Sequence, residues 1–183
     1  MCGIAGVFDA DATPDPTVVA AMTSALSHRG PDDEGTYADG PVSIGHKRLS
    51  IIDPESGRQP IFNEDGSVCI VFNGEIYNYA SLRTALVSSG HSFSTGADTE
   101  VLVHLYEEHG PSFVDRLEGM YAFALWDAES ECLLLSRDPM GIKPLFIADD
   151  GDSMAFASEL TALPESDVGN GGIDETSLSQ YFG

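Results

Sequence analysis

The chain has 183 residues, 42% of them hydrophobic, which is enough for one domain with a full core and no stabilising disulfide or metal framework. Thirty acidic residues against eight basic ones give a net charge of −22, and such a surface repels phosphate, which disfavours nucleic acid as a partner. No run approaches the roughly 18 apolar residues of a membrane span, and no secretory signal pattern opens the chain. We therefore predict a cytoplasmic protein with no membrane partner.

In chain order, the pattern predicts many short strands with helices grouped between them. The expected elements are a strand over 2–8, a helix over 17–26, strands over 34–37, 42–46 and 68–72, helices over 78–88 and 99–109, strands over 121–126, 132–136, 145–147 and 154–157, a loop over 169–172 and a helix over 174–181. Hairpin-connected strands around grouped helices indicate an α+β domain of antiparallel sheets covered by helices. Periodicity leaves the number of layers open.

The excess of acidic residues indicates the kind of solution in which the protein works. Only Lys47 and Lys143 are lysines, and the acids are spread among apolar segments instead of gathering in a tail. Acidic, lysine-poor surfaces are typical of halophilic proteins, because the Debye length falls to about 3 Å at molar salt and screens the repulsion between carboxylates. We predict a halophilic protein.

Three aspartates near the N-terminus have the spacing of a calcium-binding loop: Asp9, Asp11 and Asp15. Pro14 stands where that loop needs glycine, and Ala20 stands where it needs a bidentate glutamate. We therefore assign no metal.

The three cysteines fit neither a disulfide framework nor a zinc site. Cys69 and Cys132 lie in apolar runs and are predicted to be buried. Cys2 differs because removal of Met1 would make it N-terminal, and a free α-amino group with a pKa of about 7.7–8.0 can take the proton of the adjacent thiol. With Met1 attached, that nitrogen is an amide and cannot act as a base. The alternative is that position two simply tolerates a small residue.

Further positions suit the same chemistry. The Asn73 side-chain amide and the Gly74 backbone N–H form a plausible oxyanion hole after a strand, although an Asn-Gly turn is the alternative. Arg48 could clamp a carboxylate or form an ordinary surface ion pair. Asp98 stands one residue before a predicted helix, where capping is its alternative role.

Seven blocks of sequence carry a family resemblance. They are CGIAGV at 2–7, HRGPD at 28–32, GHKRLSIID at 45–53, FNGEIYN at 72–78, GADTE at 96–100, LEGMYAFA at 117–124 and RDPMGIKPL at 137–145. In this order and spacing, the chain closely resembles the N-terminal glutaminase domain of glutamine-hydrolysing asparagine synthetases. These are class II glutamine amidotransferases of the N-terminal nucleophile hydrolase superfamily.

The resemblance implies a four-layer αββα sandwich of two antiparallel sheets between helices. It implies hydrolysis of L-glutamine to L-glutamate and ammonia through a thioester on Cys2, whose α-amino group is the base, with Asn73 and Gly74 as the oxyanion hole. Arg48 would hold the α-carboxylate of glutamine, and Glu75 and Asp98 would recognise its α-amino group. The implied substrate-binding residues are Arg48, Leu49, Ser50, Ile51, Ile52, Asn73, Gly74, Glu75 and Asp98. His28 and Arg29 lie in a block resembling a loop that covers substrate, with a structural role as the alternative.

The resemblance also implies a partner. Residues 1–165 would form the amidotransferase domain, and residues 166–183 would begin a linker or helix toward a synthetase domain, in cis or in trans. That domain would use ATP and Mg²⁺, whereas the amidotransferase domain needs no cofactor. The SGGxDS nucleotide loop of the synthetase domain is absent from this chain. Residues 170–174 resemble it superficially but lack both serines, and no GxxxxGK[ST] loop occurs either. We therefore expect a truncated or stand-alone chain, with its acceptor substrate and a homodimer left open.

Two other functions stay open at this point. The first is a binding or regulatory module that keeps the fold without catalysis, and an assay of glutamine hydrolysis separates it. The second is an N-terminal nucleophile hydrolase that acts on another amide, which a competition of glutamine against asparagine and acylated amines separates.

Overall fold

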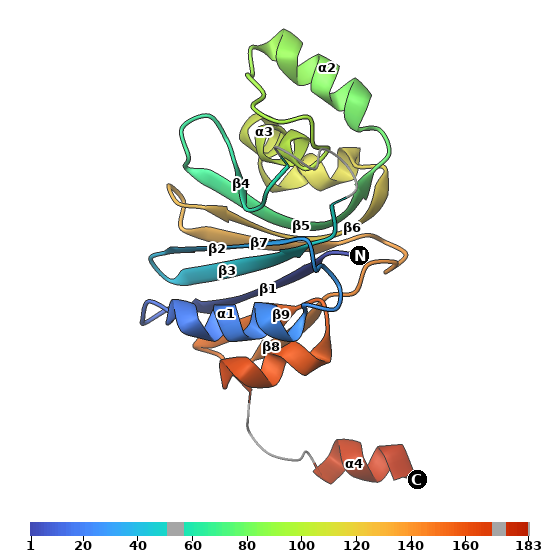
Figure 1. Ribbon diagram of the computed structural model, residues 1–183. Helices are drawn as coiled ribbons and strands as arrows, with labels where there is room; N and C mark the ends of the chain where they lie inside the picture. Colours follow the sequence, from blue (N-terminus) through green and yellow to red (C-terminus); the bar gives the residue numbers. More distant parts are fainter. Residues whose placement is uncertain (51–56, 170–174, 183) are drawn as a thin grey trace.

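Two antiparallel sheets lie face to face, each covered on its outer side by helices (Figure 1). The computed structural model describes residues 1–50, 57–169 and 175–182. The five-stranded sheet has the order β2 (Asp33–Asp39), β3 (Val42–Arg48), β1 (Gly3–Asp9), β9 (Ser153–Ala157) and β8 (Phe146–Asp149). The four-stranded sheet has the order β4 (Ile61–Phe62), β5 (Val68–Ile76), β6 (Gly119–Asp127) and β7 (Cys132–Arg137).

Helices form the two outer layers. The four-stranded sheet is covered by α3 (Glu100–His109) and the 3-10 helix η1 (Gly110–Arg116), with α2 (Tyr79–Ser89) packed on α3. The five-stranded sheet is covered by α1 (Pro16–Ala25) and the 3-10 helix η2 (Leu160–Ser166). The last helix, α4 (Glu175–Phe182), lies apart from the sandwich (Figure 1).

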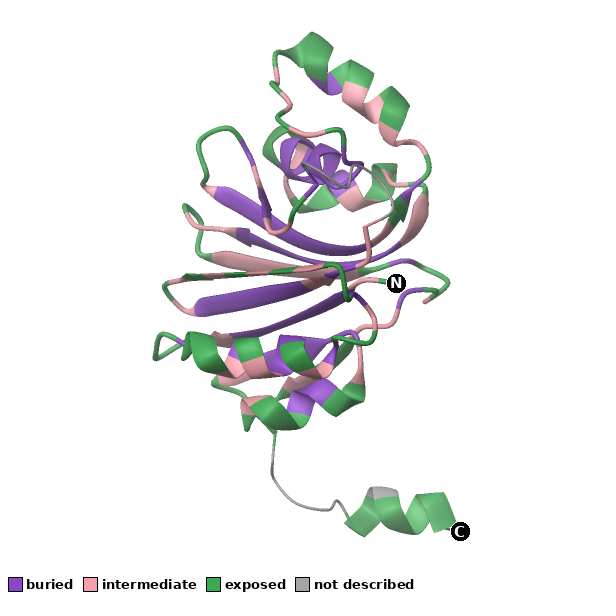
Figure 2. Ribbon diagram, viewed as in Figure 1, coloured by how far each residue is buried: buried purple, intermediate pink, exposed green. Residues whose placement is uncertain are grey.

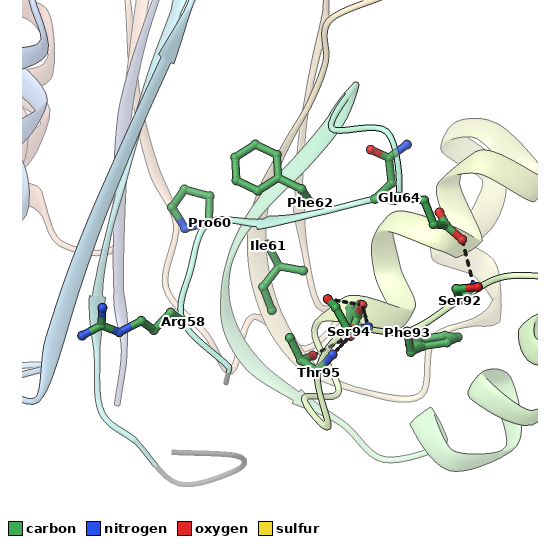
Figure 3. Close-up of a pocket in the computed structure, with 11 residues that line it drawn as sticks. Arg58, Pro60, Ile61, Phe62, Glu64, Ser92, Phe93, Ser94 and Thr95 are labelled. Atoms are coloured by element: carbon green, nitrogen blue, oxygen red, sulfur yellow. Dashed lines mark hydrogen bonds between the residues drawn. The ribbon is translucent and has the colours of Figure 1, made fainter. Parts of the chain in front are cut away.

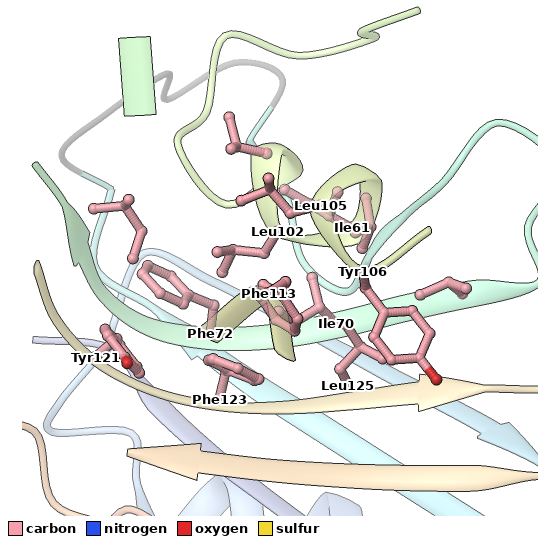
Figure 4. Close-up of a cluster of buried hydrophobic side chains, with 14 of the residues drawn as sticks. Ile61, Ile70, Phe72, Leu102, Leu105, Tyr106, Phe113, Tyr121, Phe123 and Leu125 are labelled. Atoms are coloured by element: carbon pink, nitrogen blue, oxygen red, sulfur yellow. The ribbon is translucent and has the colours of Figure 1, made fainter. Parts of the chain in front are cut away.

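The central strands bury both faces, as Figure 2 shows. In β5, Val68, Ile70 and Phe72 pack against the helices of the outer layer (Figure 4), whereas Cys69 and Val71 pack against the other sheet. This two-residue alternation is the period of a strand, and burial of both faces explains the continuous apolar run. The β6 side chains that face the five-stranded sheet are Ala122, Ala124 and Trp126.

The α+β class and the αββα arrangement predicted for the chain are confirmed. Three elements were not predicted, namely β4, η1 and η2. The expected strand over 68–72 continues through Asn73 and Gly74 to Ile76. Cys69 is buried as predicted, but Cys132 is only half-buried, because β7 is an edge strand of its sheet.

Two expectations concern segments that the structure covers only in part. The loop predicted over 169–172 lies outside the described residues except for Gly169, and the helix predicted over 174–181 corresponds to α4. Within the described ranges, no helix combines the length and the apolar character needed to cross a bilayer.

Candidate active site

Three strand ends meet at one end of the sandwich. β1 and β3 are antiparallel, with Gly3 opposite Lys47, so Cys2 lies beside the end of β3, where Arg48 stands. The end of β5, which carries Asn73, belongs to the facing sheet. The chain's N-terminus accordingly lies at the seam between the two sheets (Figure 1). Residues far apart in the sequence therefore converge on one pocket.

That pocket has a volume of about 170 Å³. Its lining includes seven of the predicted site residues, namely Cys2, Arg48, Leu49, Asn73, Gly74, Glu75 and Asp98. Of the remaining predicted residues, Ser50 is not among the lining residues, and its backbone N–H donates to the Asp32 carboxylate at 2.8 Å. Ile51 and Ile52 lie outside the described residues.

The backbone of Leu49 holds the Cys2 sulfur. The Leu49 N–H donates to Cys2 Sγ at 3.4 Å, and the thiol donates to the Leu49 carbonyl oxygen at 3.7 Å. The backbone of Cys2 is anchored as well, because Arg29 Nε donates to its carbonyl oxygen at 2.9 Å. The thiol is therefore half-buried and oriented at the pocket wall.

Asn73 lines the pocket and carries an unpaired donor. Its side chain is buried, yet its Nδ2 atom has no hydrogen-bond partner among the described residues. A buried amide without a partner costs about 1–3 kcal/mol, so such groups call for an explanation. The neighbouring Gly74 cannot carry a side chain, because a Cβ there would overlap the Met120 carbonyl oxygen and lie 2.8 Å from Tyr121 Cα. Asn73 and Gly74 both line the pocket that Cys2 lines.

Charged groups line the rest of the pocket. Arg48 is buried, while Glu75 is exposed at the rim. Asp98 is buried and accepts a hydrogen bond from the Ile76 N–H at 2.9 Å. Burial raises the pKa of Asp98, and the charge of Glu75 acts in the same direction. A buried guanidinium and two carboxylates can bind the carboxylate and the ammonium of an amino acid, respectively.

The structure bears on two of the alternatives that the sequence left open. Asp98 is not an N-cap residue, because α3 begins at Glu100 and the N-cap position belongs to Thr99. Arg29 and His28 are not pocket-lining residues. Both contact the Glu159 carboxylate, with Arg29 Nη1 at 2.8 Å and His28 Nε2 at 2.9 Å, and the hydrogen bond from Arg29 lowers the pKa of Glu159. This favours the structural alternative for the pair.

The sequence reasoning missed several lining residues, among them Gln59, Thr99, Met120 and Lys143. Lys143 is buried, with Nζ 3.6 Å from Met1 Sδ. Two sequence features could have identified Lys143: it lies in the RDPMGIKPL block, and it is one of only two lysines in the chain. Gln59 offered no comparable signal, although its side-chain oxygen accepts from the Phe72 N–H at 2.6 Å.

A larger cavity of about 520 Å³ lies elsewhere, between β4 and the segment that follows α2 (Figure 3). Its lining residues include Arg58, Phe62, Phe93 and Thr95 but no cysteine. The smaller pocket is therefore the candidate active site, because it holds the Cys2 thiol, the unpaired amide of Asn73 and the buried cation of Arg48 together.

Comparison with known proteins identifies the family of the chain. Residues 1–183 match the family model described as "Glutamine amidotransferase domain". "Asparagine synthetase [glutamine-hydrolyzing] 2" of Bacillus subtilis (strain 168) is 44% identical over 89% of the chain, which covers 22% of that protein. "Asparagine synthetase [glutamine-hydrolyzing] 1" of the same organism is 41% identical over 100% of the chain, which covers 29% of that protein. The chain thus spans less than a third of these relatives.

The fold has a matching solved structure. The glutamine phosphoribosylpyrophosphate amidotransferase from B. subtilis, complexed with ADP and GMP, superposes with a TM-score of 0.77 at 26% identity. The match covers 91% of this chain and 44% of that one. The resemblance drawn from the seven sequence blocks is confirmed, and the chain belongs to the glutamine amidotransferase domain family.

Proposed function

We propose that this domain hydrolyses L-glutamine to L-glutamate and ammonia, with Cys2 as nucleophile. The observation that carries the proposal is the buried, unpaired Nδ2 of Asn73 in the pocket that holds Cys2 and Arg48. An amide donor kept without a protein partner suits an oxygen that becomes negatively charged only during the reaction. The family of the chain supports the same chemistry.

The proposed reaction starts once Met1 is removed. The α-amine of Cys2 takes the thiol proton, and the sulfur attacks the side-chain amide carbon of glutamine. Asn73 Nδ2 and the Gly74 N–H stabilise the oxyanion of the tetrahedral intermediate. The protonated amine returns its proton to the leaving nitrogen, which departs as ammonia and leaves a thioester. Water, activated by the same amine, then hydrolyses the thioester to glutamate.

The charged groups divide the recognition of glutamine between them. Arg48 holds the α-carboxylate, and Asp98 with Glu75 holds the α-ammonium group. Leu49 supplies backbone to the pocket wall, and Ser50, Ile51 and Ile52 extend that wall in the proposal. This supports selection of a free amino acid over an acylated amine, because both charges of the α-carbon must be matched.

Removal of Met1 is a requirement of the proposed mechanism. It lines the pocket, and its amino group donates to the Arg29 carbonyl oxygen at 3.2 Å. While Met1 remains attached, the Cys2 nitrogen is an amide and part of the pocket is filled. Removal of Met1 thus supplies the base and opens the space at the sulfur.

The ammonia is proposed to reach an asparagine-synthetase-type domain, in cis or in trans. The names of the relatives and the chain's coverage of less than a third of their length support this. ATP and Mg²⁺ would act in that domain, and the amidotransferase domain would need no cofactor. Residues 1–165 and 166–183 are proposed as domain and linker, although buried packing continues to Val168. The acceptor substrate stays open.

The test uses intact mass and ammonia release. Protein shown by mass to lack Met1 should hydrolyse glutamine, Cys2→Ala should not, and Cys69→Ala should keep its activity with a modest loss of stability. An alanine inserted between Met1 and Cys2 keeps the thiol but moves the α-amine away, so it should also abolish turnover. Ammonia release by Cys2→Ala at nearly the wild-type rate would disprove the mechanism.

A further inference from the structure

A second polar cluster lies away from the glutamine pocket. It consists of Glu64, between β4 and β5, His91, just after α2, and His104 and Glu107, three residues apart on α3. One ligand atom from each residue lies within 4.8 Å of the other three. His104 is buried, His91 is half-buried, and both carboxylates are exposed enough to reach from solvent. The described part of the chain thus gathers two imidazoles and two carboxylates from three segments.

We propose that these four residues bind a divalent transition metal of the Zn²⁺ class. Tetrahedral Zn²⁺ with ligand distances of about 2.0–2.2 Å separates its ligand atoms by about 3.3–3.6 Å. His104 Nδ1 lies 2.9 Å from a Glu107 oxygen and 3.1 Å from a Glu64 oxygen. His91 Nδ1 lies 3.2 Å and 3.7 Å from oxygens of the same two glutamates. These His–Glu separations lie near the edge of such a tetrahedron, but Glu64 faces the two histidines with different oxygens. The four ligand atoms lie within 4.8 Å of one another, so side-chain shifts must draw them together around a metal.

Hydrogen bonding alone satisfies the cluster poorly. A neutral imidazole has one N–H, so His104 Nδ1 can donate to only one of its two carboxylate neighbours. His91 Nδ1 faces the same two carboxylates, and the His91 and His104 rings lie with centroids 4.8 Å apart. A cation between the nitrogens and the carboxylates would offset the charge of both glutamates and use all four ligands.

One of the two outer nitrogens, His91 Nε2, has the kind of partner that a metal-bound histidine has. A histidine that binds metal through one nitrogen usually donates its other N–H to a carboxylate or carbonyl. His91 Nε2 lies 3.1 Å from a Glu108 oxygen. His104 Nε2 is buried without a hydrogen-bond partner and lies 3.9 Å from Glu100. Glu108 therefore orients the His91 ring toward the site.

The site is accessible and connected to the glutamine pocket. Glu64 lines the larger cavity, where it also accepts the Ser92 N–H at 3.0 Å (Figure 3). The segment that carries Ser92 is also tied to α3, because Glu100 of α3 accepts the backbone N–H groups of Ser94 and Thr95. This segment leads to Asp98 in the glutamine pocket. A metal that joins it to α3 would act structurally, by stabilising the support of Asp98.

The experiment measures Zn²⁺ binding to the full, untagged, chelator-treated chain. A Cys2→Ala background removes the thiol, which could otherwise bind zinc with the N-terminal amine. We expect one Zn²⁺ per chain by calorimetry and a rise in melting temperature that equal Mg²⁺ does not produce. Co²⁺ should give the visible absorption of a tetrahedral site without a thiolate charge-transfer band.

Substitutions locate the binding. Glu108→Gln should weaken Zn²⁺ binding by about 10–100-fold, as loss of an outer partner does, and His91→Gln should weaken it more. His109→Gln, on the same helix but outside the cluster, should bind like the parent. The melting temperature of His91→Gln without metal shows whether the fold tolerates this substitution of a half-buried residue. Absence of binding to the parent, full binding by both His91→Gln and Glu64→Gln, or an equal response to Mg²⁺ would overturn the proposal.

Because the binding assay uses a Cys2→Ala protein, it does not depend on glutamine hydrolysis. Loss of the glutaminase mechanism would leave this site standing, and absence of zinc binding would leave the glutaminase mechanism standing.

Discussion

At the scale of single residues, Asn73 and Arg48 are buried in the same pocket but differ in what they can do for a reaction. A positive charge already matches the carboxylate of the bound substrate, so it contributes to binding before any bond changes. An unpaired amide donor finds its strongest acceptor only when the carbonyl oxygen becomes an oxyanion. The two side chains should therefore affect different kinetic constants.

The corresponding prediction compares two alanine substitutions. Arg48→Ala should raise KM for glutamine far more than it lowers kcat, because it removes a charge-assisted contact with the substrate. Asn73→Ala should lower kcat by about 10²–10³-fold, the range for loss of one oxyanion donor. Steady-state kinetics on protein without Met1 would measure both. The assignment of roles fails if the two effects are interchanged.

Sequence motifs found seven of the fifteen residues that line the pocket. Cys2, Arg48, Asn73, Gly74 and Asp98 stand in blocks whose residue types suit the chemistry, and the fold brings them together. Their roles remain predictions. Tertiary contacts between distant segments could not be predicted, such as the hydrogen bond from the Ile76 N–H of β5 to the Asp98 carboxylate before α3.

The histidine–glutamate cluster shows the same limit. Only His104 and Glu107, three residues apart on one helix, are neighbours that the sequence alone can reveal. His91 and Glu64 join them through the tertiary fold, from separate segments. Cysteine spacing and the calcium-loop pattern therefore gave no indication of this site.

At the scale of elements, the extension of β5 through Asn73 and Gly74 shows how pairing overrides local preference. An Asn-Gly pair is a strong turn signal, so the strand was expected to end at Phe72. Instead, Gly74 pairs with Tyr121 of β6, and its missing side chain permits the close approach of the Met120 carbonyl. Only the partner strand could decide this.

A buried histidine joins the two sheets beside the site. His46 lies on β3, and its Nε2–H donates to the Phe72 carbonyl oxygen on β5 at 3.1 Å. That carbonyl belongs to the peptide bond that leads into Asn73. Burial lowers the pKa of His46 from 6.5 to about 3, so the side chain stays neutral in the folded protein at neutral pH.

This shift predicts a loss of stability in acid. Above pH 6.5 His46 is neutral in both the folded and the unfolded state and costs nothing. Between pH 6.5 and about 3 only the unfolded state takes up a proton at His46. The free energy of unfolding therefore falls by up to about 1.4 kcal/mol for each pH unit of acidification. His46→Gln keeps an amide donor for Phe72 and does not titrate, so its acid slope should be shallower.

Denaturant unfolding of both proteins from pH 7 to pH 4 would measure the difference. Carboxylates whose pKa is lowered by folding, such as Asp138 and Glu159, also destabilise the protein when they are protonated in acid. They do so equally in both proteins, so the difference between the two free energies of unfolding reports His46 alone. Parallel pH curves for the two proteins would contradict a neutral, buried His46.

At the scale of the whole molecule, the layered fold explains where the site lies. The sheets bury their central strands against each other and against helices, so polar chemistry is confined to the ends of strands. The start of β1 and the ends of β3 and β5 lie at the same edge and bring Cys2, Arg48 and Asn73 into one pocket there. The α+β class was readable from the hairpin-connected strands around grouped helices, whereas the number of layers came only from the family resemblance.

The charge of the whole molecule gives the last prediction. Among the described residues, Arg29, Lys47 and Arg58 form ion pairs with Glu159, Glu34 and Asp33, but thirty acids face only eight basic side chains. Most carboxylates therefore repel one another at low ionic strength. Raising KCl from about 0.1 M to about 2 M shortens the Debye length from roughly 10 Å to a few ångströms and removes most of this repulsion.

Salt that is excluded from the surface also strengthens hydrophobic burial, an effect of the same sign that is mild for KCl. The melting temperature should therefore rise with KCl across that range. Melts followed by circular dichroism at several KCl concentrations would measure it. A variant in which several exposed acids, such as Glu129 and Asp150, are changed to their amides should respond less to salt, because it carries less repulsion to screen. A flat or falling melting temperature in the parent would contradict the proposed halophilic character and leave the glutaminase proposal untouched.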